Sequence, residues 1–76
     1  MPIISINLFA SLGRLTPPEC DNYSVEDGTT VMVLLEKLGV PLGEAKLIFI
    51  NGVMGTLNIV IEDGDRIGVF PPVGGG

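Results

Sequence analysis

The sequence predicts an α+β domain in which one helix packs on one face of a mixed β-sheet of four to five strands. Three observations predict it: only one segment has the apolar period of a helix, strand-like segments lie on both sides of it, and the chain is 76 residues long. That length leaves room for a single hydrophobic core. We therefore expect one domain over residues 1–72 and a flexible glycine tail over residues 73–76.

The first third of the chain predicts two strands. Apolar residues occupy positions 4, 6 and 8, and this alternation is typical of a half-buried strand over residues 3–9. Residues 10–19 contain two consecutive prolines and have no helical period, so we expect a connector there. A second strand is expected over residues 20–25.

A helix is predicted over residues 31–38. Thr30 is a residue type that caps helices, Gly39 fits the left-handed position that ends them, and Pro41 prevents the helix from resuming. The apolar stripe has the spacing i, i+3, i+4, i+7 and consists of Val31, Leu34, Leu35 and Leu38. We expect this stripe to cover one face of the sheet.

The second half of the chain predicts the remaining strands. Asn51-Gly52 favours a tight hairpin turn after a strand, and Pro71-Pro72 ends the last strand. The expected elements are a strand over residues 46–50 with its return, a short strand within residues 56–61, a turn at residues 63–65 and a last strand over residues 66–70. If the first and last strands pair centrally, the tail leaves from the middle of the sheet.

Composition and charge exclude several classes of protein. Nine acidic and four basic residues give a net charge of −5, which is the wrong sign for a nucleic-acid partner. A lone Cys20 and the lack of histidine argue against disulfide scaffolds, zinc modules, iron–sulfur clusters and imidazole catalysis, and we predict no metal site. No apolar run approaches the length of a membrane span and the start lacks a signal-peptide pattern, so we expect a cytoplasmic protein.

The glycine tail is the strongest candidate for chemistry. Three glycines without Cβ atoms can lie extended in a channel too narrow for side chains and bring the Gly76 carboxylate close to a partner's backbone. Residues 72–76 span roughly 15 to 18 Å when extended. A terminal glycine run is also common at frayed ends, and the glycines alone leave that alternative open.

Longer motifs resemble a known family. Residues 63–76 combine an Asp-Gly-Asp turn, an apolar strand, the run Phe-Pro-Pro-Val and a glycine end, and Asn51-Gly52 follows the third strand. This pattern, with Thr30-Val31, Leu34-Leu35 and Leu38-Gly39 in the helix, resembles the ubiquitin-like sulfur carriers of the MoaD/ThiS family. The resemblance implies the β-grasp fold. This sequence departs from the family pattern in two places. Position 74 is Gly, where the molybdopterin branch often has Ala or Ser, and residues 53–61 carry no charge, where relatives commonly have charged residues.

The resemblance also implies a mechanism in which the protein is a carrier rather than an enzyme. An E1-like enzyme would use ATP and Mg²⁺ to adenylate Gly76, and a persulfide donor would convert it to a thiocarboxylate. Pro72, Val73, Gly74 and Gly75 would thread the tail into an acceptor enzyme, such as the large subunit of a molybdopterin or tungsten-pterin synthase, with the thiamine and tRNA-thiolation branches open. No cofactor would be bound. A protein modifier joined to lysines through Gly76, and an interaction module with an idle end, remain alternatives.

An exposed apolar surface is predicted on the strand over residues 46–50. Every residue from Leu47 to Ile50 is apolar, yet a single helix can cover only one sheet face. By its similarity to ubiquitin's third strand we place Ile48 outward, with Ile50 and Phe70 beside it, as the surface that docks on partners. A second small core or a homodimer is the alternative.

Two further features have simpler interpretations. Glu62, Asp63 and Asp65 could pair with basic residues around a partner's tail channel, but such a cluster is more often a solvated turn. Cys20 has no basic neighbour in sequence and is expected to be inert.

Overall fold

The computed structural model describes residues 1–72, which form five strands, one α-helix and two 3₁₀ helices. The strands are β1 (Ile3–Leu8), β2 (Tyr23–Ser24), β3 (Leu47–Ile50), β4 (Val53–Met54) and β5 (Arg66–Phe70). The α-helix is α1 (Val31–Leu38), and the 3₁₀ helices are Ala10–Leu15 and Leu42–Glu44.

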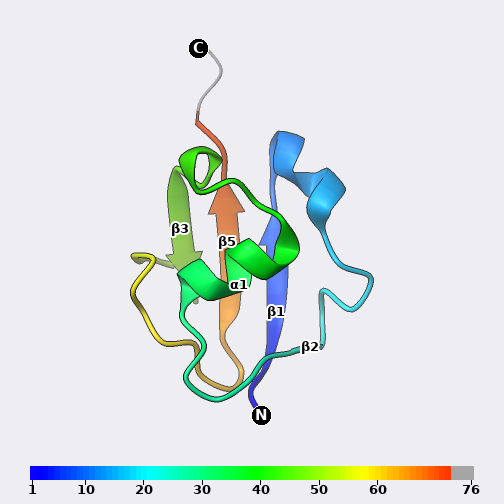
Figure 1. Ribbon diagram of the computed structural model, residues 1–76, viewed down its shortest axis with the longest axis vertical. Coiled ribbons are helices and arrows are strands. Elements are labelled where there is room, and N and C mark those ends of the chain that lie inside the picture. Colours follow the sequence, from blue (N-terminus) through cyan, green and yellow to red (C-terminus); the bar gives the residue numbers. More distant parts are fainter. Residues whose placement is uncertain (73–76) are drawn as a thin grey trace.

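The sheet has the strand order β2-β1-β5-β3-β4, with β5 at its centre. β1 and β5 run parallel, while the β1–β2, β3–β5 and β3–β4 pairs are antiparallel. Figure 1 shows α1 lying across the sheet, and the described chain leaving β5 at the end of the molecule opposite the N-terminus. The predicted mixed sheet, single helix and central pairing of the first and last strands are confirmed.

The helix begins and ends where the sequence predicts. The Thr30 Oγ1 accepts a hydrogen bond from the Val33 N–H at 3.3 Å, and Gly39 adopts the left-handed conformation with φ 82°. Val31, Leu34 and Leu35 are fully buried against the sheet, and Leu38 packs at the margin of the core. Two N–H groups of the first turn are satisfied from outside the helix, because Val31 and Met32 donate to carbonyls of the loop before β5.

The connector over residues 10–19 contains an element that the sequence did not reveal. A 3₁₀ helix over Ala10–Leu15 places the Leu12 side chain in the core with no exposed surface. Only Leu12 of these six residues is fully buried, and one buried residue produces no repeating apolar pattern, so periodicity could not detect the element.

One predicted strand is shorter than expected, and another is absent. The second strand covers only Tyr23–Ser24 rather than residues 20–25, although the Cys20 carbonyl still accepts a hydrogen bond from the Ile6 N–H. Residues 56–61 form no strand. Only Val60 bridges to Thr30, because the carbonyls of this segment are used to complete the first turn of α1.

The two turns at the start of β5 are joined by their side chains. The Asp65 Oδ1 accepts from the Asn51 side-chain amide at 2.9 Å, and the Asn51 Oδ1 accepts from the Arg66 N–H at 2.9 Å. The second Asp65 carboxylate oxygen accepts from the Glu62 N–H at 2.8 Å. Asn51 has a positive φ of 55°, as the tight hairpin turn requires. The Asn-Gly and Asp-Gly-Asp motifs therefore fix the β3–β4 hairpin against the start of β5.

We expect Asp65→Ala to lower the free energy of unfolding by about 1–2 kcal/mol, since it leaves one amide and one N–H without their acceptor. Glycine tolerates the positive φ of position 51. Asn51→Gly should therefore lower the free energy of unfolding by less in the Asp65→Ala variant than in the unchanged protein. Urea unfolding of the two single variants and the double variant measures this coupling. Asp21→Ala, with the same charge change and an exposed side chain, is the control. If the losses in unfolding free energy of the two single variants simply add in the double variant, Asn51 and Asp65 do not stabilise the turns together.

Candidate functional site

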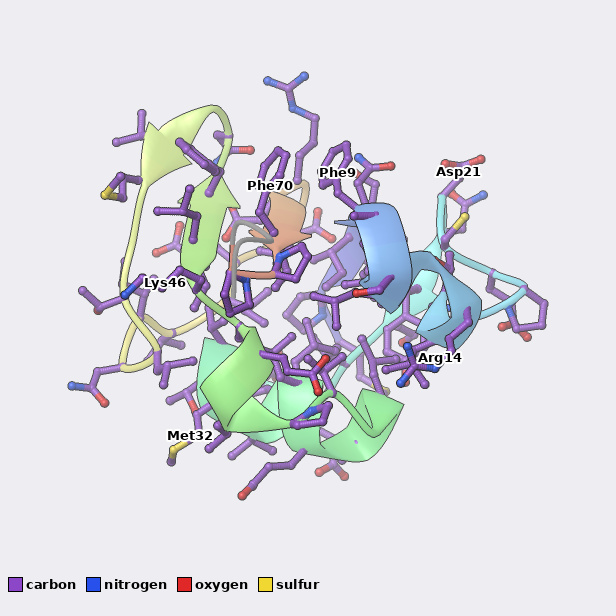
Figure 2. The ribbon with its side chains drawn as sticks, turned by 90° about the horizontal axis from the view of Figure 1, so that it is seen from above. Phe9, Arg14, Asp21, Met32, Lys46 and Phe70 are labelled. Atoms are coloured by element: carbon purple, nitrogen blue, oxygen red, sulfur yellow. The ribbon has the colours of Figure 1, made fainter. Side chains whose placement is uncertain are left out.

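The three phenylalanines of the chain gather on the face of the sheet opposite α1. In β5 the side chains of Ile67 and Val69 are buried in the core, so Phe70 points to the other face. Figure 2 shows Phe70 and Phe9 beside each other on the side of the sheet away from Met32 of α1. We call the surface made by Phe9, Phe49 and Phe70 the aromatic face.

The rings of the aromatic face contact one another directly. Phe9 and Phe70 are stacked with ring centroids 4.1 Å apart and an interplanar angle of 3°. Phe49 meets Phe70 edge to face, at 5.6 Å and 82°. Gly68 lies between them, opposite Asn7 in β1 and Phe49 in β3. Because it has no side chain, the rings surround a shallow hollow of about 200 Å³ that Arg66 and Asn7 also line.

Of the three predicted docking residues, only Phe70 lies on this face. The prediction that Ile48 points outward is wrong: its side chain is 5% exposed and belongs to the core. Ile50 lies on the same inner face and is partly buried against that core. The outward residues of this strand are Leu47 and Phe49 instead.

The register of β3 against β5 gives the reason for this correction. Ile48 pairs with Val69 and Leu47 pairs with Phe70, so each pair shares one face of the sheet. The strand Leu47–Ile50 is apolar at every position, and such a strand contains no alternation from which its inner face could be predicted. A placement one residue out of step exchanges the two faces. Phe49 was missed for this reason. Phe9 follows β1, and the signal available for it was that it shares its strand face with polar Asn7.

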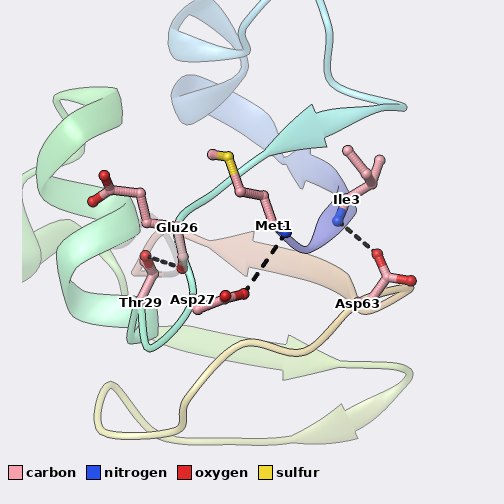
Figure 3. Close-up of polar contacts among 6 residues, drawn as sticks. All are labelled: Met1, Ile3, Glu26, Asp27, Thr29 and Asp63. Carbon is pink, nitrogen blue, oxygen red and sulfur yellow. Dashed lines mark hydrogen bonds and ion pairs between the residues drawn. The ribbon is translucent and has the colours of Figure 1, made fainter.

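The predicted acidic cluster lies at the opposite end of β5 from Phe70, and its nearest member, Asp65, is five residues or about 16 Å away along the strand. The Asp63 Oδ1 accepts a hydrogen bond from the Ile3 N–H at 2.8 Å (Figure 3), and Asp65 holds the turn described above. Glu62 is exposed. These contacts support the turn interpretation of Asp63 and Asp65, at the end of β5 away from Phe70.

The described chain ends immediately beside the aromatic face. The Phe70 carbonyl accepts a hydrogen bond from the Lys46 N–H at 3.0 Å, which holds the last residue of β5 to the sheet. Pro71 is half-buried and Pro72, a predicted threading residue, is exposed. Val73, Gly74, Gly75 and the predicted reacting residue Gly76 lie outside the described residues.

Within residues 1–72 no three histidine, cysteine or carboxylate side chains are arranged to hold a metal ion. Cys20 is half-buried. None of the helices described has the length and apolar character needed to span a membrane. The uncharged stretch 53–61 exposes apolar side chains: Val53 is 68% and Met54 62% exposed.

A mixed five-stranded sheet with a central parallel pair and one covering helix defines a ubiquitin-like β-grasp domain. The family model described as Mut7-C ubiquitin matches residues 1–74, and the chain belongs to that family. The resemblance to ubiquitin-like carriers read from the sequence is thereby confirmed for family and fold.

Two solved structures share this fold. SAMP1 from Haloferax volcanii has a TM-score of 0.68 and 23% identity, over 96% of this chain and 98% of that chain. The putative molybdopterin converting factor, subunit 1, from Pyrococcus furiosus has a TM-score of 0.70 and 22% identity, over 96% of this chain and all of that chain. A search of curated protein sequences gave no match.

Proposed function

We propose that this protein is a cytoplasmic sulfur carrier whose Gly76 carboxylate is activated by a partner enzyme. An E1-like enzyme would transfer AMP from ATP, with Mg²⁺, to the carboxylate and release pyrophosphate. A persulfide donor would then displace AMP and, after reduction of the acyl disulfide by a thiol, leave a thiocarboxylate. The acceptor would be a cofactor-forming synthase, with the pterin branch favoured by the sequence Phe-Pro-Pro-Val before the glycines.

The observation that carries this proposal is the position of the chain end in the fold. The central strand β5 ends at Phe70, in contact with the other two rings of the aromatic face. A partner that covers these rings therefore receives Pro72 at a fixed place, and the four residues beyond it reach roughly 13 Å further if extended. The folded body supplies binding and the tail supplies the reacting group.

The aromatic face replaces the surface predicted from Ile48. Exposed aromatic clusters are typical of interfaces, where tryptophan, tyrosine and phenylalanine bury large areas at small entropic cost. Phe9 is 40% exposed although a soluble domain usually covers such a ring. We infer that the activating enzyme and the acceptor enzyme both dock here, one after the other.

Changing Phe70 to Ser is expected to weaken binding to the activating enzyme by about 30-fold, the loss typical of a central aromatic contact. Isothermal titration calorimetry measures the affinity, and circular dichroism checks that the variant is folded. Val53→Ser, at an exposed position on the edge strand β4, should change affinity less than about 2-fold. Equal affinities for the Phe70 variant and the unchanged protein would rule out docking through this face.

The carrier and modifier fates differ in the product formed at Gly76. Intact-mass analysis of the protein isolated with its native partners should reveal a fraction in which one sulfur replaces one oxygen. A modifier would instead yield peptides from other proteins with the tail's glycines joined to lysine. Only isopeptide products, with no sulfur-containing fraction, would replace the carrier proposal by the modifier alternative.

A further inference from the structure

The hollow at the centre of the aromatic face has an electrostatic character that differs from the rest of the molecule. Arg66 is one of only four basic residues in a chain with nine acidic ones, and it lines the hollow beside Asn7. No acidic residue lines it. The hollow is therefore a small apolar depression with one positive charge at its edge.

The charge of Arg66 is not neutralised within the described part of the chain. Its guanidinium forms no ion pair or hydrogen bond among residues 1–72. The bonded groups of Arg66 are in its backbone: the N–H donates to the Asn51 Oδ1, and the carbonyl accepts from the Asn51 N–H at 2.9 Å. The carboxylate nearest in sequence, Asp65, directs one oxygen to the Asn51 amide and the other to the Glu62 N–H. These two hydrogen bonds hold the Asp65 carboxylate in the turn, and it forms no ion pair with Arg66.

We infer that this hollow receives a partner segment that presents a large apolar side chain next to a carboxylate. The inference rests on the proposed docking role of the aromatic face and specifies the chemistry of the partner. The apolar side chain would lie over Gly68 between the three rings, and the carboxylate would pair with Arg66. A volume of about 200 Å³ suits one side chain and is below the range of small-molecule pockets.

Strand geometry sets the spacing of the two partner groups. Arg66 and Gly68 are two residues apart on one face of β5, a separation of about 7 Å. Residues i and i+2 of a partner strand have that spacing, and residues i and i+4 of a helix come close to it. A cationic partner group would be repelled by the positive charge of Arg66. A nucleic-acid phosphate backbone would be repelled by the net charge of −5.

The first test compares charge and shape variants in binding to the activating enzyme. Arg66→Glu should weaken binding at least 10-fold, while Lys37→Glu, an identical charge change on the exposed side of α1, should change it less than about 2-fold at physiological salt. Gly68→Ala adds a Cβ in ordinary contact with Phe9, at 3.5 Å, so it fills the hollow without forcing the rings apart. It should weaken binding several-fold, unlike Gly43→Ala in open space.

Equal losses for Arg66→Glu and Lys37→Glu would overturn the inference, because net charge alone would explain them. The Arg66→Glu variant should raise the KM for pyrophosphate release at least 10-fold, while Lys37→Glu, outside the hollow, should leave both KM and rate within about 2-fold. A rate loss without a change in KM would also contradict a docking role. If the unchanged protein releases no pyrophosphate, the proposed function fails, and the second test still decides the inference.

The second test needs no partner enzyme. Titration of the ¹⁵N-labelled protein with 4-phenylbutyrate, which carries an apolar ring and a carboxylate, should shift the amide signals of Gly68 and Phe70. The neutral amide of the same compound, or Arg66→Gln with the acid, should give shifts at least threefold smaller. Equal shifts for acid and amide, shifts confined to other surfaces, or no shifts would overturn the inference. A dimer in sedimentation that Arg66→Glu dissociates would assign the hollow to a second copy instead.

Discussion

Removing Gly75 and Gly76 is expected to reduce pyrophosphate release with the activating enzyme to an undetectable level while leaving the fold unchanged. The proposal places the reacting carboxylate on Gly76, and a shortened tail cannot bring its new end to the same position in the partner. The core of the described residues extends from Ile4 to Val69. We therefore expect the thermal midpoint to stay within about 2 °C, the shift that well under 1 kcal/mol produces in a domain of this size.

Addition of one alanine after Gly76 provides the matched control. It keeps every residue of the chain but converts the Gly76 carboxylate into an amide, so it should be equally inactive. Both variants should still bind the activating enzyme within about 10-fold of the unchanged protein, because the aromatic face is intact. Pyrophosphate release by the shortened protein would show that Gly76 is not the reacting residue.

Ile67→Ala is expected to have the largest effect on stability, a loss of about 3–4 kcal/mol in the free energy of unfolding. Ile67 has no exposed surface and lies in the central strand, paired with Ile6 on one side and Ile50 on the other. Its truncation leaves a cavity between β5 and α1. Since small domains are stable by only about 5–15 kcal/mol, this single change brings the protein near its folding limit.

Urea unfolding followed by circular dichroism measures this loss. Val53→Ala is the control, because Val53 is 68% exposed on the edge strand and should lose less than about 0.5 kcal/mol. A loss below about 1 kcal/mol for Ile67→Ala would mean that β5 does not form the centre of the core.

The parts of the fold that follow local rules were predictable. Thr30 and Gly39 define the helix through capping and a positive φ, and the even-numbered residues of β1 are buried as their alternation predicts. Gly52 and Asn51 make the tight turn for the same reason. Each of these signals depends on residues within one element or one turn.

Three features that depend on contacts between elements were not predicted. The inner face of β3 is chosen by its register with β5, and the apolar run Leu47–Ile50 gives no internal indication of it. Leu12 enters the core from a 3₁₀ helix that leaves no period in the sequence. The aromatic face joins residues 9, 49 and 70 from three strands or their ends, so only the sheet order brings them together.

The most direct test of the central claim is an ATP–pyrophosphate exchange assay of the purified protein with the E1-like enzyme of the same organism, followed by intact-mass analysis after addition of a persulfide donor. We expect exchange that depends on Gly76 and a product in which one oxygen has been replaced by sulfur. Absence of exchange at saturating protein, with binding to the enzyme demonstrated, would contradict the account.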